Sequence, residues 1–352
     1  MSSDAPAHRV IEIDHANVQL IPQLLYRVFG YTYTAVSLYS EAGVRAALDE
    51  GSHFFVAVDD AGRPAGLLAL RFTQPSRALA EVGVLAVDPV LSSAARGRVL
   101  RLLGQALSAR SYELIEDGLR GLMSTEVTVH TLAQRLVMHF GFVTTGIYLG
   151  LAPAWAERLR NPPDERSRSR ANGSASRLRN RRTETVSALP FDKMIAPYAV
   201  ALPARFDALL RTIYAGLQMP VSFEPGADPH GPSTVVEDLD LLRSRAVVRF
   251  SRVGDDAPAV ALERVEHYRR GQIELIHVAL PLTHVRVDDT VNALTAAGFS
   301  FGALVPLYAG DDALVLQFLN GVPVDITDAD LHSPIAKLIL RDIMQPGAAV
   351  LR

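Results

Sequence analysis

The spacing of apolar residues divides the first part of the chain into strands and helices. Val18, Ile21, Leu24 and Leu25 recur at helical period, whereas residues 54–58 form a short apolar run typical of strands. The turn-forming stretch 59–64 predicts a hairpin with the apolar run 65–72. Later segments predict a strand at 80–87, a helix around 99–107, a strand at 122–128, a helix from 130 and a strand after 142. This order predicts a mixed α/β sheet.

The pattern recurs in weaker form after residue 190. It predicts a helix at 205–214 and strands at 246–250, 259–265, 273–281 and 313–319. The helical stretch 291–297 with Gly298-Phe299 after it parallels the helix before Gly141-Phe142. We interpret this similarity as an internal duplication with a degenerate second copy.

An arginine-rich segment lies between the two parts. Residues 158–182 contain nine arginines, two acidic residues and almost nothing apolar. Such a segment cannot bury enough surface to offset the entropy of ordering it, so we expect 153–190 to be a disordered linker. It would join a domain at 8–152 to one at 191–346, since 352 residues suggest two domains. Nucleic acid is not expected as a partner, because no aromatic residues interleave with these arginines.

Composition narrows the class of protein. A hydrophobic content of 49% with 21% charged residues is typical of soluble globular proteins. The sequence shows neither a long apolar span nor a secretory signal, so we expect a cytoplasmic protein without a membrane partner. The absence of cysteine excludes disulfides, thiolate zinc sites and a cysteine nucleophile. Only Lys193 and Lys337 among 35 basic residues are lysines, a skew typical of bacterial genomes of high G+C content.

The stretch 79–146 points most directly to chemistry. A strand that ends at Asp88-Pro89 is followed by a loop of small and basic residues, with Arg96, Gly97 and Arg98, and then by a long helix. This order places backbone N–H groups and arginines at a helix start just beyond a strand end, where an anionic phosphate group binds readily.

Residues 8–152 resemble the GNAT N-acetyltransferase superfamily, and 195–345 look like a second, eroded copy. The resemblance implies two acyl-CoA N-acyltransferase-like domains, the first with a sheet that splays after its fourth strand. It also implies that acetyl-CoA or another acyl-CoA lies in that gap as the acyl donor, without a metal ion. The thioester is already activated, so the reaction needs only a base for the amine proton and a proton donor for the leaving thiolate.

The family's motifs give individual residues expected roles. Its fourth strand corresponds to residues 80–87, and its phosphate-binding loop begins at Arg96. The resemblance therefore implies that the donor is bound by Val84, Leu85, Ala86, Val87, Arg96, Gly97 and Arg98. Later glycine positions of that loop are Val99 and Arg101 here, and the family's usual Asn and Tyr of the following helix are His130 and Val137.

Two residues are candidates for moving protons. Glu81 could be the general base, or simply a charged residue at the exposed end of a strand. His130 could act as base or as proton donor to the thiolate, and the alternative is a surface histidine at a capped helix start. Strand alternation puts Glu126 and Thr128 on one face, where they could converge with His130.

Four residues are candidates for substrate binding. Tyr31 and Tyr33 lie where this family closes the acceptor side of its cleft, although half-buried packing is the alternative. Thr128 could face the substrate or cap the helix, and Gln134 could orient His130 or contact the acyl chain.

A metal site is not expected. Glu274, His277 and His284 lie within eleven residues, but alternation along the strand puts Glu274 and His277 on opposite faces.

The sequence therefore favours an N-acyltransferase that moves an acyl group from a CoA thioester, or from a carrier-protein phosphopantetheine, to an amine. The acceptor is a small-molecule or protein amine, and an acyl carrier protein is a further candidate partner. The alternative is a non-catalytic GNAT-like binding or regulatory protein that has kept the fold and lost the chemistry, as Val99, Arg101 and Val137 suggest.

Overall fold

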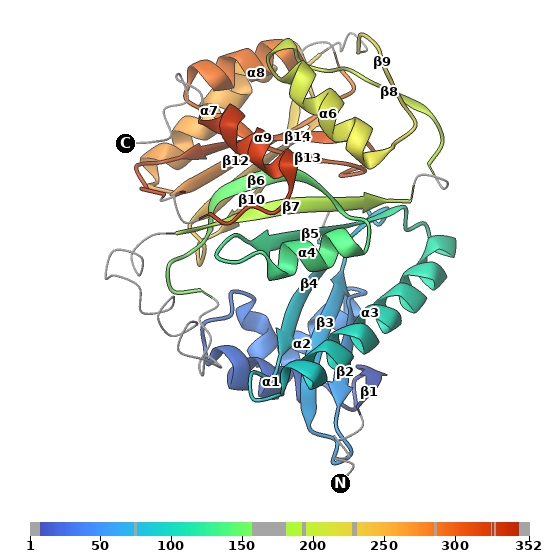
Figure 1. Cartoon of the computed structure of the whole chain (residues 1–352). Coiled ribbons are helices and arrows are strands. Elements are labelled where there is room, and N and C mark those ends of the chain that lie inside the picture. The colour runs from blue at the N-terminus through green and yellow to red at the C-terminus, as the bar shows by residue number, and fades with distance from the viewer. Residues whose placement is uncertain are drawn as a thin grey trace. The chain divides into compact units, whose positions relative to one another are not determined.

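The computed structural model of the protein describes most of the chain in two compact units (Figure 1). The described part of the first unit is 8–73, 76–119 and 154–156, and the second holds 120–153 and the described residues from 181 onward. The described residues are 8–73, 76–156, 181–191, 195–226, 231–284, 287–324, 326 and 329–344.

The first unit is an antiparallel sheet with helices on both faces. Its strands pair in the order β1 (Arg9–Glu12), β2 (His53–Val58), β3 (Pro64–Arg71) and β4 (Leu79–Val87). Its helices are α1 (Leu20–Phe29), the 3₁₀ turn η1 (Val36–Tyr39), α2 (Glu41–Asp49) and α3 (Ser93–Glu116). The mixed α/β fold and the hairpin at 59–64 are confirmed, and Gly62 supplies the positive φ that the turn needs.

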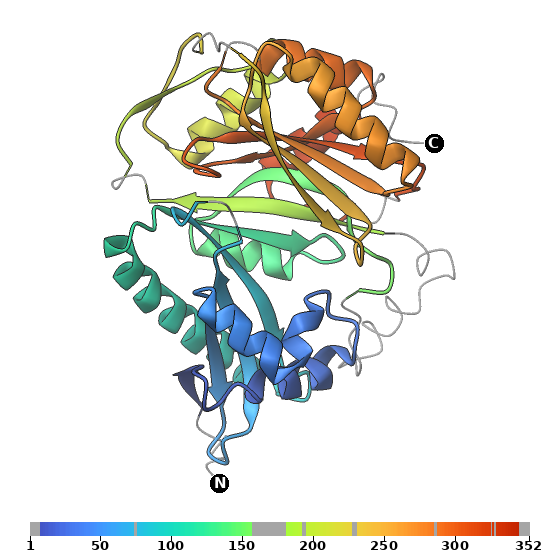
Figure 2. The ribbon, with the colours of Figure 1, turned by 180° about the vertical axis from the view of Figure 1, so that it is seen from behind.

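Alternating strand residues divide the core of this unit between the two faces. Ile21, Leu24, Leu25 and Val28 of α1 pack with Phe54, Val56, Leu67 and Ala69 of the sheet. Helix α3 covers the other face, where Gly66 of β3 leaves room for Val99, and Figures 1 and 2 show α1 and α3 on opposite sides of β2–β4. The sequence places apolar residues on both faces of β2 and β3 for this reason.

The second unit contains a larger mixed sheet. Its strands run in the order β5 (Gly121–Val127), β7 (Arg182–Pro190), β6 (Val143–Ala152), β13 (Ser300–Val305), β14 (Ala313–Leu319), β12 (Leu275–Pro281), β11 (Arg245–Arg252) and β10 (Thr234–Asp240). Among the described residues, β11 and β12 are the one parallel pair within this sheet. Two short strands, β8 (Tyr198–Val200) and β9 (Val221–Phe223), form a separate parallel pair.

Four helices form the apolar core of the second unit against this sheet. They are α6 (Asp207–Leu217, preceded by the 3₁₀ turn η3, Ala204–Phe206), α7 (Ala257–Arg270), α8 (Val287–Ala296) and α9 (Pro334–Ile343). A fifth helix, α4 (Leu132–His139), connects β5 to β6. Ser333 caps α9 by accepting hydrogen bonds from the Ile335 and Ala336 amides.

One strand–helix–strand–strand arrangement occurs twice in the second unit. In β5-α4-β6-β7 and in β12-α8-β13-β14, the last strand inserts antiparallel between the first two. Gly141-Phe142 precedes β6, and Gly298-Phe299 precedes β13. Both glycines have positive φ, which explains why both helices end there. The wider interpretation, two copies of one acyltransferase-like domain, stays a prediction.

The predicted linker boundary is wrong. Residues 182–190, assigned to the linker at 153–190, form β7, which is hydrogen-bonded to β5 and β6 along its length. Thr183, Thr185 and Val186 favour a strand, but the adjoining arginines masked this signal in the sequence. Residues 157–180 lie outside the described part of the chain. The compact units also divide the chain at 119/120, not between 8–152 and 191–346.

A second segment was predicted with the wrong period. Residues 259–265 were expected to be a strand and belong to α7. Its buried residues are Ala257, Ala261, Val265 and Tyr268, which follow helical spacing, and Pro258 lies in its first turn, where a missing N–H is harmless. Across the described residues, no helix has the length and apolar character needed to traverse a lipid bilayer.

We expect Gly66→Ala to lower the free energy of unfolding by about 1–3 kcal/mol, the usual cost of overpacking a core. A Cβ on Gly66 would lie 2.4 Å from Cγ1 of Val99 and force α3 away from β3. Urea denaturation of the full chain measures the change.

The double variant Gly66→Ala/Val99→Ala tests that cause. Removal of the Val99 methyls relieves the clash, so the two changes should cost less together than the sum of the single changes. Gly62→Ala serves as a comparison, because a Cβ there meets no atom and only the positive φ is strained. Strict additivity of the Gly66 and Val99 effects would contradict close packing at this point.

Candidate functional site

Strand β4 contains a β-bulge at the residues expected to bind the donor. Leu67 pairs with Ala86 and Ala69 pairs with Gly83, so Val84 and Leu85 together lie opposite one residue of β3. Val84 has φ of 56°, which is unusual for a β-branched residue. The bulge interrupts the ladder to β3 at this point, as bulges beside functional sites often do. Val84 and Ala86 point into the core, whereas Leu85 and Val87 stay half-buried.

Glu81 is held in place at the beginning of β4. Its Oε1 accepts a hydrogen bond from Nη2 of Arg71 at 3.1 Å, and its Oε2 accepts one from Oγ1 of Thr73 at 2.9 Å. The Glu81 carboxylate raises the pKa of the Arg71 guanidinium, which therefore stays charged. Nε of Arg71 is buried without a hydrogen-bond partner. Glu81 is thus a positioned carboxylate beside a permanent cation.

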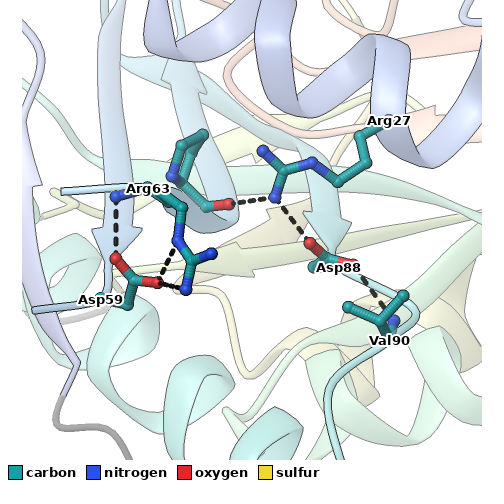
Figure 3. A network of polar contacts seen from close by, with 6 residues as sticks. Arg27, Asp59, Arg63, Asp88 and Val90 are labelled. Atoms are coloured by element: carbon teal, nitrogen blue, oxygen red, sulfur yellow. Dashed lines mark hydrogen bonds and ion pairs between the residues drawn. The ribbon is translucent and has the colours of Figure 1, made fainter. Parts of the chain in front are cut away.

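An ion pair fixes the end of β4 and the loop after it. Nη1 of Arg27 donates to Oδ2 of Asp88 at 2.7 Å and to the carbonyl oxygen of Pro64 at 3.0 Å (Figure 3). The Val90 amide donates to Oδ1 of the same carboxylate. Asp88 is buried, whereas the nearby Arg63–Asp59 pair of the hairpin is far more open at its arginine. Arg27 therefore ties α1 to the loop that leads into α3.

Helix α3 begins at Ser93, so Arg96, Gly97 and Arg98 lie inside it and not in the loop before it that the sequence predicts. Ser92 caps the helix by accepting a hydrogen bond from the Ala95 amide. Arg98 is exposed, and a Cβ on Gly97 would meet no atom within 4 Å, so the first turn has open space beside it. Arg96 is half-buried, and its Nε has no hydrogen-bond partner. The Arg96 amide donates to the carbonyl oxygen of Ser92, so what Arg96 and Arg98 can offer a phosphate group is their guanidinium groups.

Val99 stands at an expected glycine position but does not fill this space. Its side chain is fully buried and faces Gly66 on β3. The departure from the family's glycine therefore leaves the outer surface of the first turn open, while the exposed Arg101 adds a further cation to the helix.

The tyrosines form an aromatic group in the first unit. The ring of Tyr31 lies 4.9 Å from that of Tyr26 and 5.5 Å from that of Tyr39, measured between centroids. Tyr31 is 75% exposed, so it has ring surface free for a ligand. Tyr33 is buried, stacks on Phe29 and acts electrostatically on Arg71. The structure thus separates an exposed Tyr31 from a packed Tyr33.

In the second unit, Glu126 is a buried carboxyl group surrounded by hydroxyls. It accepts hydrogen bonds from Ser124 on its own strand, from Thr185 at 2.7 Å and from Ser187 at 3.0 Å. Burial raises the pKa of Glu126 to about 7, against the three hydroxyl contacts, which lower it. The sequence singled out Glu126 but missed Thr185 and Ser187, because both were assigned to the linker.

Thr128 and Gln134 bind backbone groups of the second unit. Oγ1 of Thr128 donates to the carbonyl oxygen of Thr183, so this hydroxyl joins β5 to β7. Nε2 of Gln134 donates to the carbonyl oxygens of Val127 and Asp330, and its Oε1 accepts from the His332 amide. Both side chains are buried. The sequence did not predict these contacts, because the partner of Thr128 lies 55 residues away and two partners of Gln134 lie almost 200 residues away.

The remaining candidates lie on the surface or in the core. His130 is exposed between β5 and α4, and Val137 on α4 is half-buried. His277 is fully buried, whereas Glu274 pairs with Arg181. Within the described residues, no group of three or more histidine, aspartate or glutamate side chains could hold a metal ion.

Sequence reasoning missed three residues that organise the first unit's candidate site. Arg71 and Thr73 bind Glu81, and Asp88 binds Arg27 at the start of the loop before α3. Of the three, only Asp88 could be noticed in the sequence, because it precedes Pro89 in a turn. The pairing of Arg71 with Glu81 follows from the β3–β4 register, in which the two residues lie directly opposite.

Comparison with known proteins finds acetyltransferases among solved structures. The ribosomal-protein-S5-alanine acetyltransferase of Vibrio fischeri is 11% identical over 56% of this chain and 100% of its own, with a TM-score of 0.38. The ribosomal-protein-S18-alanine N-acetyltransferase of Escherichia coli is 16% identical over 53% and 94%, with a TM-score of 0.37. The spermidine/spermine N-acetyltransferase SpeG of Vibrio cholerae is 15% identical over 53% and 97%, with a TM-score of 0.35.

No family model and no curated protein matches the chain. The similar structures are acetyltransferases, the class that the sequence resembles, and they match about half of the chain. These are similarities of backbone arrangement, so any role for a side chain has to come from the residues of this chain.

We expect Arg27→Gln to lower the free energy of unfolding by about 1–3 kcal/mol, because it leaves the buried Asp88 carboxylate without its cation. Thermal and urea unfolding measure the effect. Arg63→Gln is the matched control, since it removes an equivalent ion pair from an exposed hairpin and should change stability far less. Equal effects of the two changes would show that the Arg27–Asp88 pair does not anchor the loop.

Because Glu126 is buried, we expect the free energy of unfolding of the protein to depend on pH. The pKa of Glu126 is about 7 in the folded state and 4.5, the ordinary value, in the unfolded state. Between these two pH values the folded state therefore keeps a proton that the unfolded state has lost. Stability contributed by the protonated group is complete below about pH 4.5 and is lost as the pH rises through 7, by a total of about 3 kcal/mol.

Glu126→Gln should remove this slope and make the protein more stable than wild type at pH 8, with near-equal stability at pH 4. Urea unfolding at both pH values measures it. Glu263→Gln, on an exposed position of α7, should leave the wild-type slope unchanged. A wild-type slope that persists in Glu126→Gln would assign the titration to another group.

Proposed function

We propose that this protein is an N-acyltransferase that uses acetyl-CoA or another pantetheine thioester as donor and an amine as acceptor. The observation that carries the proposal is the succession, within one unit, of a positioned carboxylate, a bulged strand and a helix start rich in donors. Glu81, the Val84–Leu85 bulge and the first turn of α3 follow one another within 18 residues.

The start of α3 suits the phosphate end of the donor. Arg96 and Arg98 would hold the pyrophosphate, or the single phosphate of a phosphopantetheine arm, and Gly97 would leave room for it between them. The fit is supported by the unpartnered Nε of Arg96 and by the open space next to Gly97. The residues 84–87 would offer backbone groups to the pantetheine amides, at the point where the bulge alters the course of β4.

Glu81 would take the proton from the amine. The amine nitrogen attacks the thioester carbon, a C–N bond forms, and the C–S bond breaks to release the thiol. Glu81 removes one proton from nitrogen, and the departing sulfur gains one from water. Arg71 and Thr73 fix the carboxylate, so it enters the reaction with its orientation already set.

Tyr31 would form part of the acceptor site, and the buried Tyr33 would pack beneath that site. An exposed aromatic ring attracts an ammonium group by cation–π interaction and also covers an apolar chain. The acceptor is therefore proposed to be a small-molecule or protein amine. An acyl carrier protein is the proposed partner if the donor is carrier-bound.

A second candidate function is non-catalytic binding by a protein of the same fold. Gln134 and Thr128 support it, because both are used to tie backbone segments together and have no spare donor for a substrate. Val137, where the family's thiolate donor stands, supports it as well. In this case a pantetheine compound would be bound without acyl transfer.

Thiol release and calorimetry separate these functions. Acetyl-CoA and longer acyl-CoAs are titrated into the full chain, and free thiol is then measured over a panel of amines. We expect Arg96→Gln to weaken donor binding by about tenfold, the usual effect of losing one charge-assisted hydrogen bond. Glu81→Gln should leave donor affinity unchanged and lower kcat by about 10²–10⁴-fold, as expected for a lost general base.

Arg101→Gln is the matched control for charge, because Arg101 is an exposed arginine on the same helix. It should change donor affinity much less than Arg96→Gln does. Binding without thiol release would favour the non-catalytic function. Failure of every pantetheine compound to bind would end both proposals, and loss of affinity in Glu81→Gln would contradict its role as base.

A further inference from the structure

Strand β11 in the second unit carries Arg245 and Arg249, neither of which has an ion-pair partner among the described residues. Ala246, Val248 and Phe250 point into the core, so alternation places Arg245 and Arg249 on the opposite face. Both arginines are half-buried, and Nε of each is buried without a hydrogen-bond partner. Guanidinium groups in such a position normally find a carboxylate or a phosphate.

The two guanidinium groups approach one phenol. Arg249 donates a hydrogen bond to the hydroxyl of Tyr308, and Arg245 acts electrostatically on the same group. Arg245 also lies over the ring of Tyr148, with Cζ 5.9 Å from the ring centroid. Burial raises the pKa of Tyr308, so its hydroxyl stays protonated and keeps a proton to donate.

A buried histidine lies behind these groups. The ring of His277 is 4.7 Å from that of Tyr148, it is completely buried, and neither of its nitrogens has a hydrogen-bond partner. Burial, Arg245 and Arg181 all lower the pKa of His277, so it is neutral and offers no charge to the arginines. Native proteins rarely leave a buried polar ring unsatisfied, which marks this cluster as incomplete without a further group.

Carboxylates on neighbouring strands do not neutralise the two arginines. In the β10–β11 register, Asp238 lies opposite Val247 and Asp240 lies opposite Arg245, but Asp240 pairs with Arg243. On the other side, Glu274 pairs with Arg181, and Glu184 lies opposite Tyr148. Asp238 also acts electrostatically on Tyr308. Within the described residues, the ion pairs of Asp240 and Glu274 are with other arginines, and no ion pair joins a carboxylate to Arg245 or Arg249.

We propose that Arg245, Arg249 and Tyr308 form a binding site for the phosphate group of a small molecule. Two guanidinium groups and a phenol hydroxyl supply more donors than the two oxygens of a carboxylate can use, whereas a phosphate has an acceptor oxygen for each. The site consists of residues of the second unit, whereas the start of α3 belongs to the first. It therefore stands whether or not the protein transfers acyl groups.

The test is calorimetry of inorganic phosphate, pyrophosphate and acetate against the full chain, in an Arg96→Gln background that removes the phosphate site proposed at α3. We expect phosphate or pyrophosphate to bind with one-to-one stoichiometry. Arg245→Gln and Arg249→Gln should each weaken binding by about tenfold, and the double variant should abolish it at millimolar ligand. Arg270→Gln is the matched control, since that exposed arginine already pairs with Glu266.

Arg245→Lys/Arg249→Lys removes the same two guanidinium groups but keeps both positive charges. It should therefore bind phosphate more tightly than the double glutamine variant, which separates loss of charge from loss of folding. Absence of binding by both phosphate compounds would overturn the proposal, and so would unchanged affinity in the double glutamine variant. Acetate that binds as tightly as phosphate would overturn the assignment to phosphate. Weakening in Arg270→Gln equal to that of the β11 variants would reduce the site to general electrostatic attraction.

Discussion

The close contact between α3 and β3 determines where the first unit can present chemistry. Gly66 is the residue that allows it, because any side chain there would meet Val99 and Leu103. Once α3 rests against the sheet, its first two turns, with Arg96 and Arg98, have a fixed position after the end of β4. The Arg27–Asp88 pair then holds the connecting loop at its base. A donor-rich helix start is useful only when its position is fixed, and these two contacts fix it.

The second unit fixes its candidate residues by a different means. Its strands β5 and β7 are linked by buried hydroxyls and one carboxyl group as well as by the backbone ladder. Such a network is stable only when every member has a partner, and Glu126 has three. Gln134 extends the same principle to the segment around residues 330–332. Buried polar groups thereby define which segments lie beside β5.

The sequence predicted local structure well where periodicity was strong. The apolar spacing in α1, the hairpin at 59–64 and the strand at 313–319 all have short-range signals, and the structure contains each of them. It failed where composition outweighed pattern, as at β7, and where a short apolar run fitted both periods, as in α7. Candidate residues Glu81 and Arg96 came from the order of elements. Their partners Arg71 and Thr73 could not be predicted in this way, because the strand register and the conformation of the loop determine the contacts with Glu81.

Strands β6 and β7 remain neighbours on both sides of the arginine-rich stretch, because Ala152 pairs with Arg182. Two residues 30 positions apart in the sequence are therefore neighbours in the sheet. The residues of the two strands themselves set this register, because a shift by one residue would exchange the buried and the exposed side chains. Substitutions in the arginine-rich sequence between the strands leave that alternation unchanged.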